Sequence, residues 1–194
     1  MMSTQAIPFL TPEQYLEIER AAEARSEYLA GAMYAMAGST LNHALIVKST
    51  SLSLGVQLRG RDCDAFTTDL RLFVRQHNLI TYPDVFVTCR PFQVLDGRKD
   101  TLTDAKFIVE VLSPSTKNYD RSEKFDYYRG LPSFREYLLL AQDKIHAEHH
   151  MRQADGSWLT REYSTLSDVI DLKSIDCSLR LADVYERVEF EAAS

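Results

Sequence analysis

Two carboxylates stand in stretches of sequence that are otherwise apolar. Asp84 lies in TYPDVFVTCR, residues 81–90, and Glu110 lies in KFIVEVLSPST, residues 106–116. Both stretches are typical of buried strands, where an unpaired charge costs several kcal/mol or more. Two such acids brought together cannot both stay ionised cheaply, but a divalent cation resolves the conflict. Mg²⁺ is usually held by one or two carboxylates with water and phosphate oxygens, so the pair predicts a site for phosphate-ester hydrolysis.

Strand periodicity decides whether the two acids can meet. Side chains alternate between the faces of a strand, so Glu110 shares one face with Ile108 and Leu112, and Asp84 shares one with Phe86. If the two strands are neighbours, the acids converge. Two plainer interpretations stay open. A Pro-Asp pair is common in turns, and a lone strand glutamate can pair with a buried arginine or lysine.

The elements that must position these acids can be read along the chain. We expect helices where caps and 3.6-residue periodicity agree, and strands where short apolar runs stand between turn residues. The expected helices cover residues 11–23, 40–60 and 120–133, and the expected strands and hairpins cover 26–38, 64–74, 80–89, 106–113, 135–141 and 144–164. This order predicts a mixed α/β fold in one domain, residues 1–194, with a sheet covered by helices.

Two local predictions concern the helices beside the acids. In the helix at 40–60, Leu41, Leu45, Leu52 and Val56 fall on one side, which predicts that this side is buried. In the helix at 120–133, Asp120 is expected to be the N-terminal cap.

Composition limits the class of protein. The chain has 194 residues and a formal net charge of -6, which argues against a surface coated with basic residues for tight nucleic-acid binding. A local basic face stays possible, and a solvated surface is the plainer alternative; the candidates are Arg59 and Arg61, and then Lys117, Arg121, Lys124 and Arg129. No secretory leader and no apolar run long enough for a bilayer is seen, so we expect a cytoplasmic protein without a membrane segment.

Two further groups of possible ligands are given plain interpretations. Cys63, Cys89 and Cys177 lack metal-type spacing and are expected to be free, mostly buried thiols. His146, Glu148 and His150 share one strand face and could bind a metal, but a solvated outer hairpin is the favoured interpretation.

Several long motifs resemble one family of nucleases. SEYLAGAMYAMAG, the NH pair in the long helix, YPDVFVT, FIVEVLSPSTKNYDRSEKFDYYR and LPSFREYLLL resemble the Uma-two-type restriction endonuclease family of the PD-(D/E)XK superfamily, over residues 8 to 190. The resemblance implies a restriction-endonuclease-like fold, a mixed sheet flanked by helices. It also implies Mg²⁺-dependent (or Mn²⁺-dependent) cleavage of DNA, by a homodimer because double-strand cutting needs two active sites.

The resemblance assigns roles to particular residues. Asp84 and Glu110 match the two motif acids that bind the metal. The motif lysine should stand two residues after Glu110, but that position is Leu112. Lys124, on the following helix, is the expected substitute. Glu27 is the expected N-terminal acid of the site.

Three hypotheses about function remain open at this level. The leading one is a metal-dependent DNA endonuclease. A second is a nuclease fold that has lost catalysis and acts as a nucleic-acid-binding or interaction module, as the missing lysine at position 112 and the acidic charge favour. A third is a phosphodiesterase that acts on another nucleic-acid substrate. Asn42 and His43 also approach the expected site, but a structural role is favoured for both.

Overall fold

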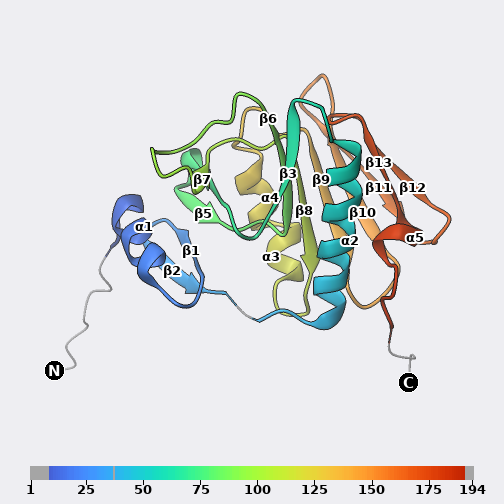
Figure 1. Ribbon diagram of the computed structural model, residues 1–194, viewed down its shortest axis with the longest axis horizontal. Helices are drawn as coiled ribbons and strands as arrows, with labels where there is room; N and C mark the ends of the chain where they lie inside the picture. The colour runs from blue at the N-terminus through green and yellow to red at the C-terminus, as the bar shows by residue number, and fades with distance from the viewer. Residues whose placement is uncertain (1–8, 37, 191–194) are drawn as a thin grey trace.

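A six-stranded mixed sheet forms the centre of the computed structural model, which describes residues 9–36 and 38–190 (Figure 1). Its strand order is β11-β10-β9-β8-β6-β3, with β8 and β9 parallel and the other neighbours antiparallel. The strands are β3 (Cys63–Thr67), β6 (Val85–Cys89), β8 (Phe107–Leu112), β9 (Glu136–Ala141), β10 (Ala147–Arg152) and β11 (Trp158–Tyr163).

A second, five-stranded sheet has the order β2-β1-β5-β4-β7. Its strands are β1 (Ser26–Leu29), β2 (Ala32–Ala35), β4 (Arg71–Val74), β5 (Leu79–Thr81) and β7 (Thr101–Leu102). A separate hairpin follows near the C-terminus, formed by β12 (Val169–Leu172) and β13 (Cys177–Arg180).

Helices cover both faces of the six-stranded sheet, as Figure 1 shows. The long helix α2 (Leu41–Gln57) and the short α5 (Leu181–Val184) pack on one face together with the β12–β13 hairpin. The short helices α3 (Lys117–Arg121) and α4 (Glu123–Tyr128) follow β8, and α4 packs on the other face beside the second sheet. Helix α1 (Pro12–Ala21) covers β1, and the 3₁₀ turn η1 (Arg75–His77) joins β4 to β5.

Much of the expected order is confirmed, including the mixed sheet flanked by helices. Helix α1 begins with the capping box of Thr11 and Gln14, with proline at its first position. Strand β8 buries both faces, and its alternate residues divide between two separate cores, so it is the central strand that its sequence predicts. The hairpin expected at 26–38 is formed by β1 and β2; Ala37, like residues 1–8 and 191–194, lies outside the described residues.

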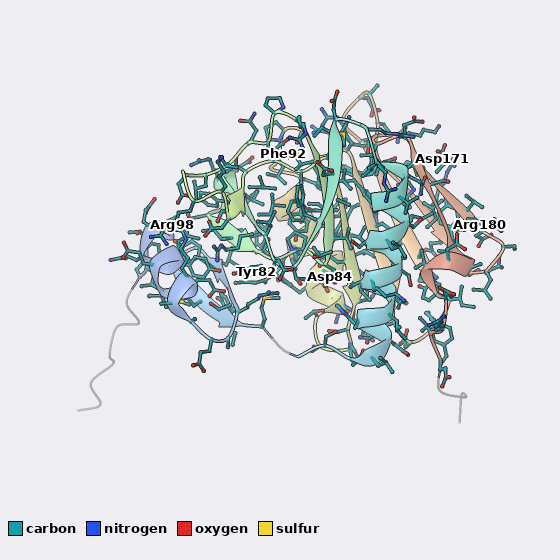
Figure 2. All side chains as sticks on the ribbon, in the orientation of Figure 1. Tyr82, Asp84, Phe92, Arg98, Asp171 and Arg180 are labelled. Carbon is teal, nitrogen blue, oxygen red and sulfur yellow. A yellow bond between two sulfur atoms is a disulfide. The ribbon has the colours of Figure 1, made fainter. Side chains whose placement is uncertain are left out.

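Two stretches that were expected to be single strands each divide between the two sheets. In the run at 64–74 the chain turns at residues 68–70, so that β3 lies in the six-stranded sheet and β4 in the five-stranded sheet. In the run at 80–89, β5 lies in the five-stranded sheet and β6 in the six-stranded sheet. In the second case Pro83 supplies the reason, because it has no N–H to donate to a ladder. Asp84 therefore lies just where the chain crosses from one sheet to the other (Figure 2).

The prediction for the buried side of helix α2 is wrong. Leu41, Leu52 and Val56 are exposed, and the face that packs on the sheet contains Ile46 and Leu54. Apolar residues occur all round this helix, so its periodicity did not distinguish the two sides.

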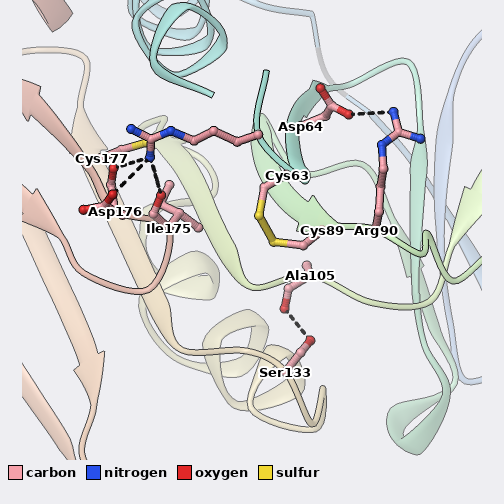
Figure 3. The surroundings of a disulfide bond; sticks show 10 residues. Cys63, Asp64, Cys89, Arg90, Ala105, Ser133, Ile175, Asp176 and Cys177 are labelled. Carbon is pink, nitrogen blue, oxygen red and sulfur yellow. Dashed lines mark hydrogen bonds and ion pairs between the residues drawn. A yellow bond between two sulfur atoms is a disulfide. The ribbon is translucent and has the colours of Figure 1, made fainter. Parts of the chain in front are cut away.

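The expectation of three free thiols is also wrong. Cys63 and Cys89 stand directly opposite each other in the β3–β6 register and form a disulfide (Figure 3). Cys177 is a free, buried thiol as expected. Which strands pair, and in which register, is a long-range property that cysteine spacing does not reveal.

Candidate active site

Two hydrogen bonds from backbone N–H groups hold the two predicted acids next to each other. Val111 N–H donates to Asp84 Oδ2 at 2.8 Å, and Asp84 N–H donates to Glu110 Oε2 at 3.3 Å. The two strands are direct neighbours, with Val85 opposite Val109. Asp84 and Glu110 therefore meet at one end of the sheet, as strand alternation predicts.

Lys124 brings a positive charge to the same place. Its Nζ lies 3.0 Å from Glu110 Oε1 and 3.3 Å from Glu27 Oε1, and both α4 and β1 contribute to the contact. Leu112 packs in the core with Ile108 and carries no charge. The structure thus places Lys124 where the sequence comparison expected a substitute lysine, and it brings all four predicted site residues together.

Three more side chains belong to the cluster. For His43 the sequence favoured a structural role although it approached the expected site, and for Asp120 and Tyr128 the sequence predicted no place there. Asp120 is buried with Oδ1 3.8 Å from Lys124 Nζ, His43 Nε2 lies 3.2 Å from Asp84 Oδ2, and the Tyr128 hydroxyl donates to Glu110 Oε1 at 2.6 Å. The prediction that Asp120 caps a helix is wrong, because it lies inside α3 and faces the cluster. Its spacing of four residues before Lys124 was the available signal.

The side chains of the cluster differ in burial. Glu110, Lys124 and Asp120 are 3, 6 and 4% exposed. The side chains of Asp84, Glu27 and His43 are 13, 18 and 19% exposed. Asp84 is therefore the more accessible of the two predicted metal-binding acids, and Glu110 is the more buried.

Burial and crowding shift the proton affinities of the group. Burial raises the pKa of Glu110 to about 8, the Lys124 ammonium opposes that shift, and the nearby Asp84 and Asp120 carboxylates add to it. Burial likewise raises the pKa of Asp120. Burial alone would lower the pKa of Lys124, but Glu110, Glu27 and Asp120 outweigh it and hold that pKa well above its usual value.

The Asp84 carboxylate favours the charged form of His43. Burial lowers the pKa of its imidazole, but the hydrogen bond and charge of Asp84 outweigh burial and raise it. Ser39 contacts the other ring nitrogen, Nδ1, at 3.0 Å. These two contacts fix the ring at the first turn of α2. Asn42, its neighbour, instead donates to the backbone carbonyls of Gln142 and Glu189.

The chemistry of the donor set fits a hard cation. Asp84 and Glu110 offer carboxylate oxygens, which Mg²⁺ and Mn²⁺ prefer as ligands. Within residues 9–36 and 38–190, no three His, Cys, Asp or Glu side chains are arranged to cage a metal ion. Two carboxylates with water and a phosphate ligand are the usual Mg²⁺ arrangement, so the residues fit that group.

The other predicted groups lie away from this cluster. Glu148 pairs with Arg121 at 2.6 Å and with His146 at 3.5 Å, and the His150 ring packs against Phe125. This strand face is therefore half-buried beneath α3 and α4, and the expectation of a solvated face is wrong. Arg61 donates to the backbone carbonyl of Asp176 at 2.6 Å (Figure 3). Four of the six residues of the suspected basic face form ion pairs with acidic side chains: Arg61, Arg121, Lys124 and Arg129.

Known proteins resemble this chain over nearly its full length. A relative from Synechocystis sp., called uncharacterized protein slr1290, is 37% identical over 185 residues, which cover 94% of this chain and 95% of the relative. A second relative from Synechocystis sp., called uncharacterized protein sll1609, is 32% identical over 162 residues, which cover 84% of this chain and 92% of the relative. A crystal structure from Anabaena variabilis, titled "a putative nuclease", shares the fold with a TM-score of 0.73 and 16% identity, covering 91% of this chain and 97% of that one.

No helix among the described residues is long and apolar enough to cross a membrane.

The family model named Uma2 and described as "Putative restriction endonuclease" matches residues 12–182. That match spans most of the chain and includes every residue of the cluster, which we call the acidic cluster: Glu27, His43, Asp84, Glu110, Asp120, Lys124 and Tyr128. The chain therefore belongs to the Uma2 family.

Proposed function

We propose that this protein is a divalent-metal-dependent nuclease that hydrolyses phosphodiester bonds in DNA. The observation that carries the proposal is the buried cluster in which Asp84, Glu110 and Lys124 meet at the end of the central sheet. Membership of the Uma2 family supports the general part of this proposal, namely that the protein is a nuclease. The metal and the DNA substrate are proposals that rest on the chemistry of the cluster.

Asp84 and Glu110 would hold Mg²⁺ or Mn²⁺. When bound, the ion would supply charge stabilisation at the phosphate and lower the pKa of water. The residues of the chain contribute by holding the two carboxylates in place. Asp84 accepts from the Val111 amide and Glu110 accepts from the Tyr128 hydroxyl, so both carboxylates are held in fixed orientations.

Lys124 provides the fixed cation beside the scissile phosphate. Its ammonium offsets negative charge that develops as water adds to phosphorus and the P–O bond to the leaving oxygen breaks. Glu27 helps to position this ammonium from β1, and the Thr81 hydroxyl in turn donates to Glu27. We place Glu27 in the site through this contact.

A second candidate function is favoured by one specific observation. Glu110 already has an ammonium at 3.0 Å and a hydroxyl at 2.6 Å, so its carboxylate is satisfied without a metal. A nuclease fold that only binds nucleic acid would show the same self-compensated cluster. The two functions differ in whether a cation binds at Asp84.

The deciding experiment is a cleavage assay on linear and plasmid DNA with Mg²⁺ or Mn²⁺ and with EDTA. Wild type is compared with Asp84→Ala and with Asp143→Ala, which removes an exposed acid elsewhere. Cleavage that needs the metal, survives in Asp143→Ala and is lost in Asp84→Ala supports the nuclease. DNA binding without cleavage under every metal condition would establish the binding module instead. RNA in place of DNA tests the third hypothesis, and size-exclusion chromatography tests the proposed homodimer.

A further inference from the structure

A recess lined by arginines lies at the other end of helix α4 from the acidic cluster. Lys124 is in the first turn of α4, and Arg129 is its C-terminal cap. Beyond Arg129 the surface forms two adjoining recesses of about 250 and 420 Å³. Arg152 and Gly156 line both recesses, and we call the two adjoining recesses together the α4 groove. The residues that the argument uses are Arg129, Arg135, Arg152 and Trp158.

The charge of the α4 groove is positive although the protein is acidic. It contains three arginines and one aspartate, Asp126, which pairs with Arg129 at 3.0 Å. In the part of the chain that the structure describes, Arg135 and Arg152 form no ion pair. The groove therefore concentrates uncompensated positive charge on a molecule with a formal net charge of -6.

Backbone contacts set the two unpaired arginines side by side. Arg152 N–H donates to the Arg135 carbonyl at 2.8 Å, at the end where β9 and β10 pair. The Arg135 guanidinium donates from one nitrogen to the carbonyls of Pro132 and Phe134, at 2.7 and 2.9 Å. These acceptors are neutral, so they orient the guanidinium without cancelling its charge. Its remaining N–H groups are available for the oxygens of a phosphate.

An aromatic side chain completes the groove. Trp158 is half-buried, with its ring packed against Phe125 and Phe134 at centroid distances of 5.0 and 5.3 Å. The remaining part of the indole lines the recess. Gly130 lies at the floor, where a Cβ would stand 3.0 Å from His77, so glycine allows η1 to approach the end of α4.

Arginines that follow a groove beside a rigid aromatic ring are the usual means of holding a single strand, since phosphates pair with guanidinium groups and an unpaired base stacks on the ring. A duplex buries its bases and cannot offer one to Trp158. We propose that the α4 groove binds single-stranded nucleic acid as a second contact, outside the acidic cluster. This deepens the proposed function, since the substrate class rests on it, but binding in the groove needs neither metal nor cleavage.

The test uses the full chain in EDTA, so that no substrate is cut. A fluorescently labelled oligo(dT) is titrated with wild type and with the double variant Arg135→Ala/Arg152→Ala. The matched control is Arg98→Ala/Arg180→Ala, which removes two exposed arginines at opposite sides of the molecule (Figure 2). We expect the groove variant to bind at least tenfold more weakly at 0.1 M salt and the control to stay within twofold. The slope of log affinity against log salt should fall by about 1.4 in the groove variant, the value for two lost phosphate contacts on a single strand.

Trp158 is the sole tryptophan of the sequence and reports on the groove directly. Stacking of a base should quench its emission as oligo(dT) binds, in wild type and control alike. Three results would overturn the proposal: equal affinity of the groove variant and the control, emission that does not change on binding, or a duplex that binds more tightly than the single strand. If wild type cuts no DNA under any metal condition while the groove effects appear, the nuclease proposal fails and the groove proposal stands. If metal-dependent cleavage is lost in Asp84→Ala while the groove variant binds like the control, the groove proposal fails and the nuclease proposal stands.

Discussion

Lys124 Nζ lies 3.0 Å from Glu110 Oε1 and 3.3 Å from Glu27 Oε1, so one ammonium bridges an acid of the central sheet and an acid of the second sheet. The lysine is contributed by a helix rather than by the strand that carries Glu110. Its long stem reaches the carboxylates from α4, so the positive charge of the site does not require a lysine two residues after the strand acid.

The first prediction concerns that charge. Lys124→Met should lower the rate of metal-dependent cleavage by about 10²-fold or more, the scale for loss of one electrostatic stabiliser. Lys117→Met, which alters an exposed lysine on α3, is the control and should cleave normally. Near-normal turnover in the Lys124 variant would exclude a role in the reaction.

The same variant has a second, structural readout. Removing one partner of a buried pair costs about 3–5 kcal/mol, because buried carboxylates are left uncompensated. At pH 5 Glu110 is already protonated, since its pKa is raised to about 8, so the loss in free energy of unfolding should be smaller at pH 5 than at pH 8.5. Denaturant titrations at both pH values measure the difference, and an equal loss at both would contradict it.

Glu110→Gln should keep the fold and abolish metal-dependent cleavage. The amide is nearly isosteric and can still accept from Tyr128, but it lacks the charge that holds Mg²⁺. Glu123→Gln, an exposed neighbour of Lys124, serves as the control. Circular dichroism checks the fold and plasmid cleavage checks activity. Unchanged cleavage with an unchanged metal requirement would remove Glu110 from the ligand set.

The apo protein should lose stability as pH rises, and added metal should restore it. The folded pKa of Glu110, about 8, lies above its ordinary value of 4.5. Its contribution is therefore fully present below pH 4.5 and is lost as pH rises through about 8, because the buried carboxylate must then ionise. Mg²⁺ or Mn²⁺ binds the ionised form, so the rise in Tm on adding metal should be larger at pH 8.5 than at pH 6. Thermal melts of wild type and Glu110→Gln measure this, and a metal shift that persists in the variant would place the ion elsewhere.

His43→Gln should weaken the site without unfolding the protein. His43 Nε2 lies 3.2 Å from Asp84 Oδ2, the oxygen that also accepts from Val111 N–H, so it helps to orient a proposed metal ligand. Loss of such a partner typically costs 10–100-fold in metal affinity or activity. Titration of Mn²⁺ in the cleavage assay should show a higher half-saturating concentration. His146→Gln, which alters a half-buried histidine paired with Glu148, is the control.

The sequence alone determined the chemical identity of the site and much of its local scaffold. Glu110 stands out because a charge in an apolar strand needs a partner, and alternation along β8 fixes its face. The capping box of α1, the hairpin of β1 and β2, and the strand β9 depend on neighbours a few residues away, so local patterns predict them. The family resemblance supplied Lys124 and Glu27, which no local pattern would distinguish from surface residues.

Tertiary structure decided how these parts meet. The division of residues 80–89 between two sheets places Asp84 at a crossover, and His43 and Asp120 reach the cluster from α2 and α3. The exposed side of α2 and the Cys63–Cys89 disulfide likewise depend on which distant elements pack or pair together. Such long-range contacts are chosen by the summed burial and backbone pairing of the whole chain, whereas a local pattern records only what each segment would favour by itself.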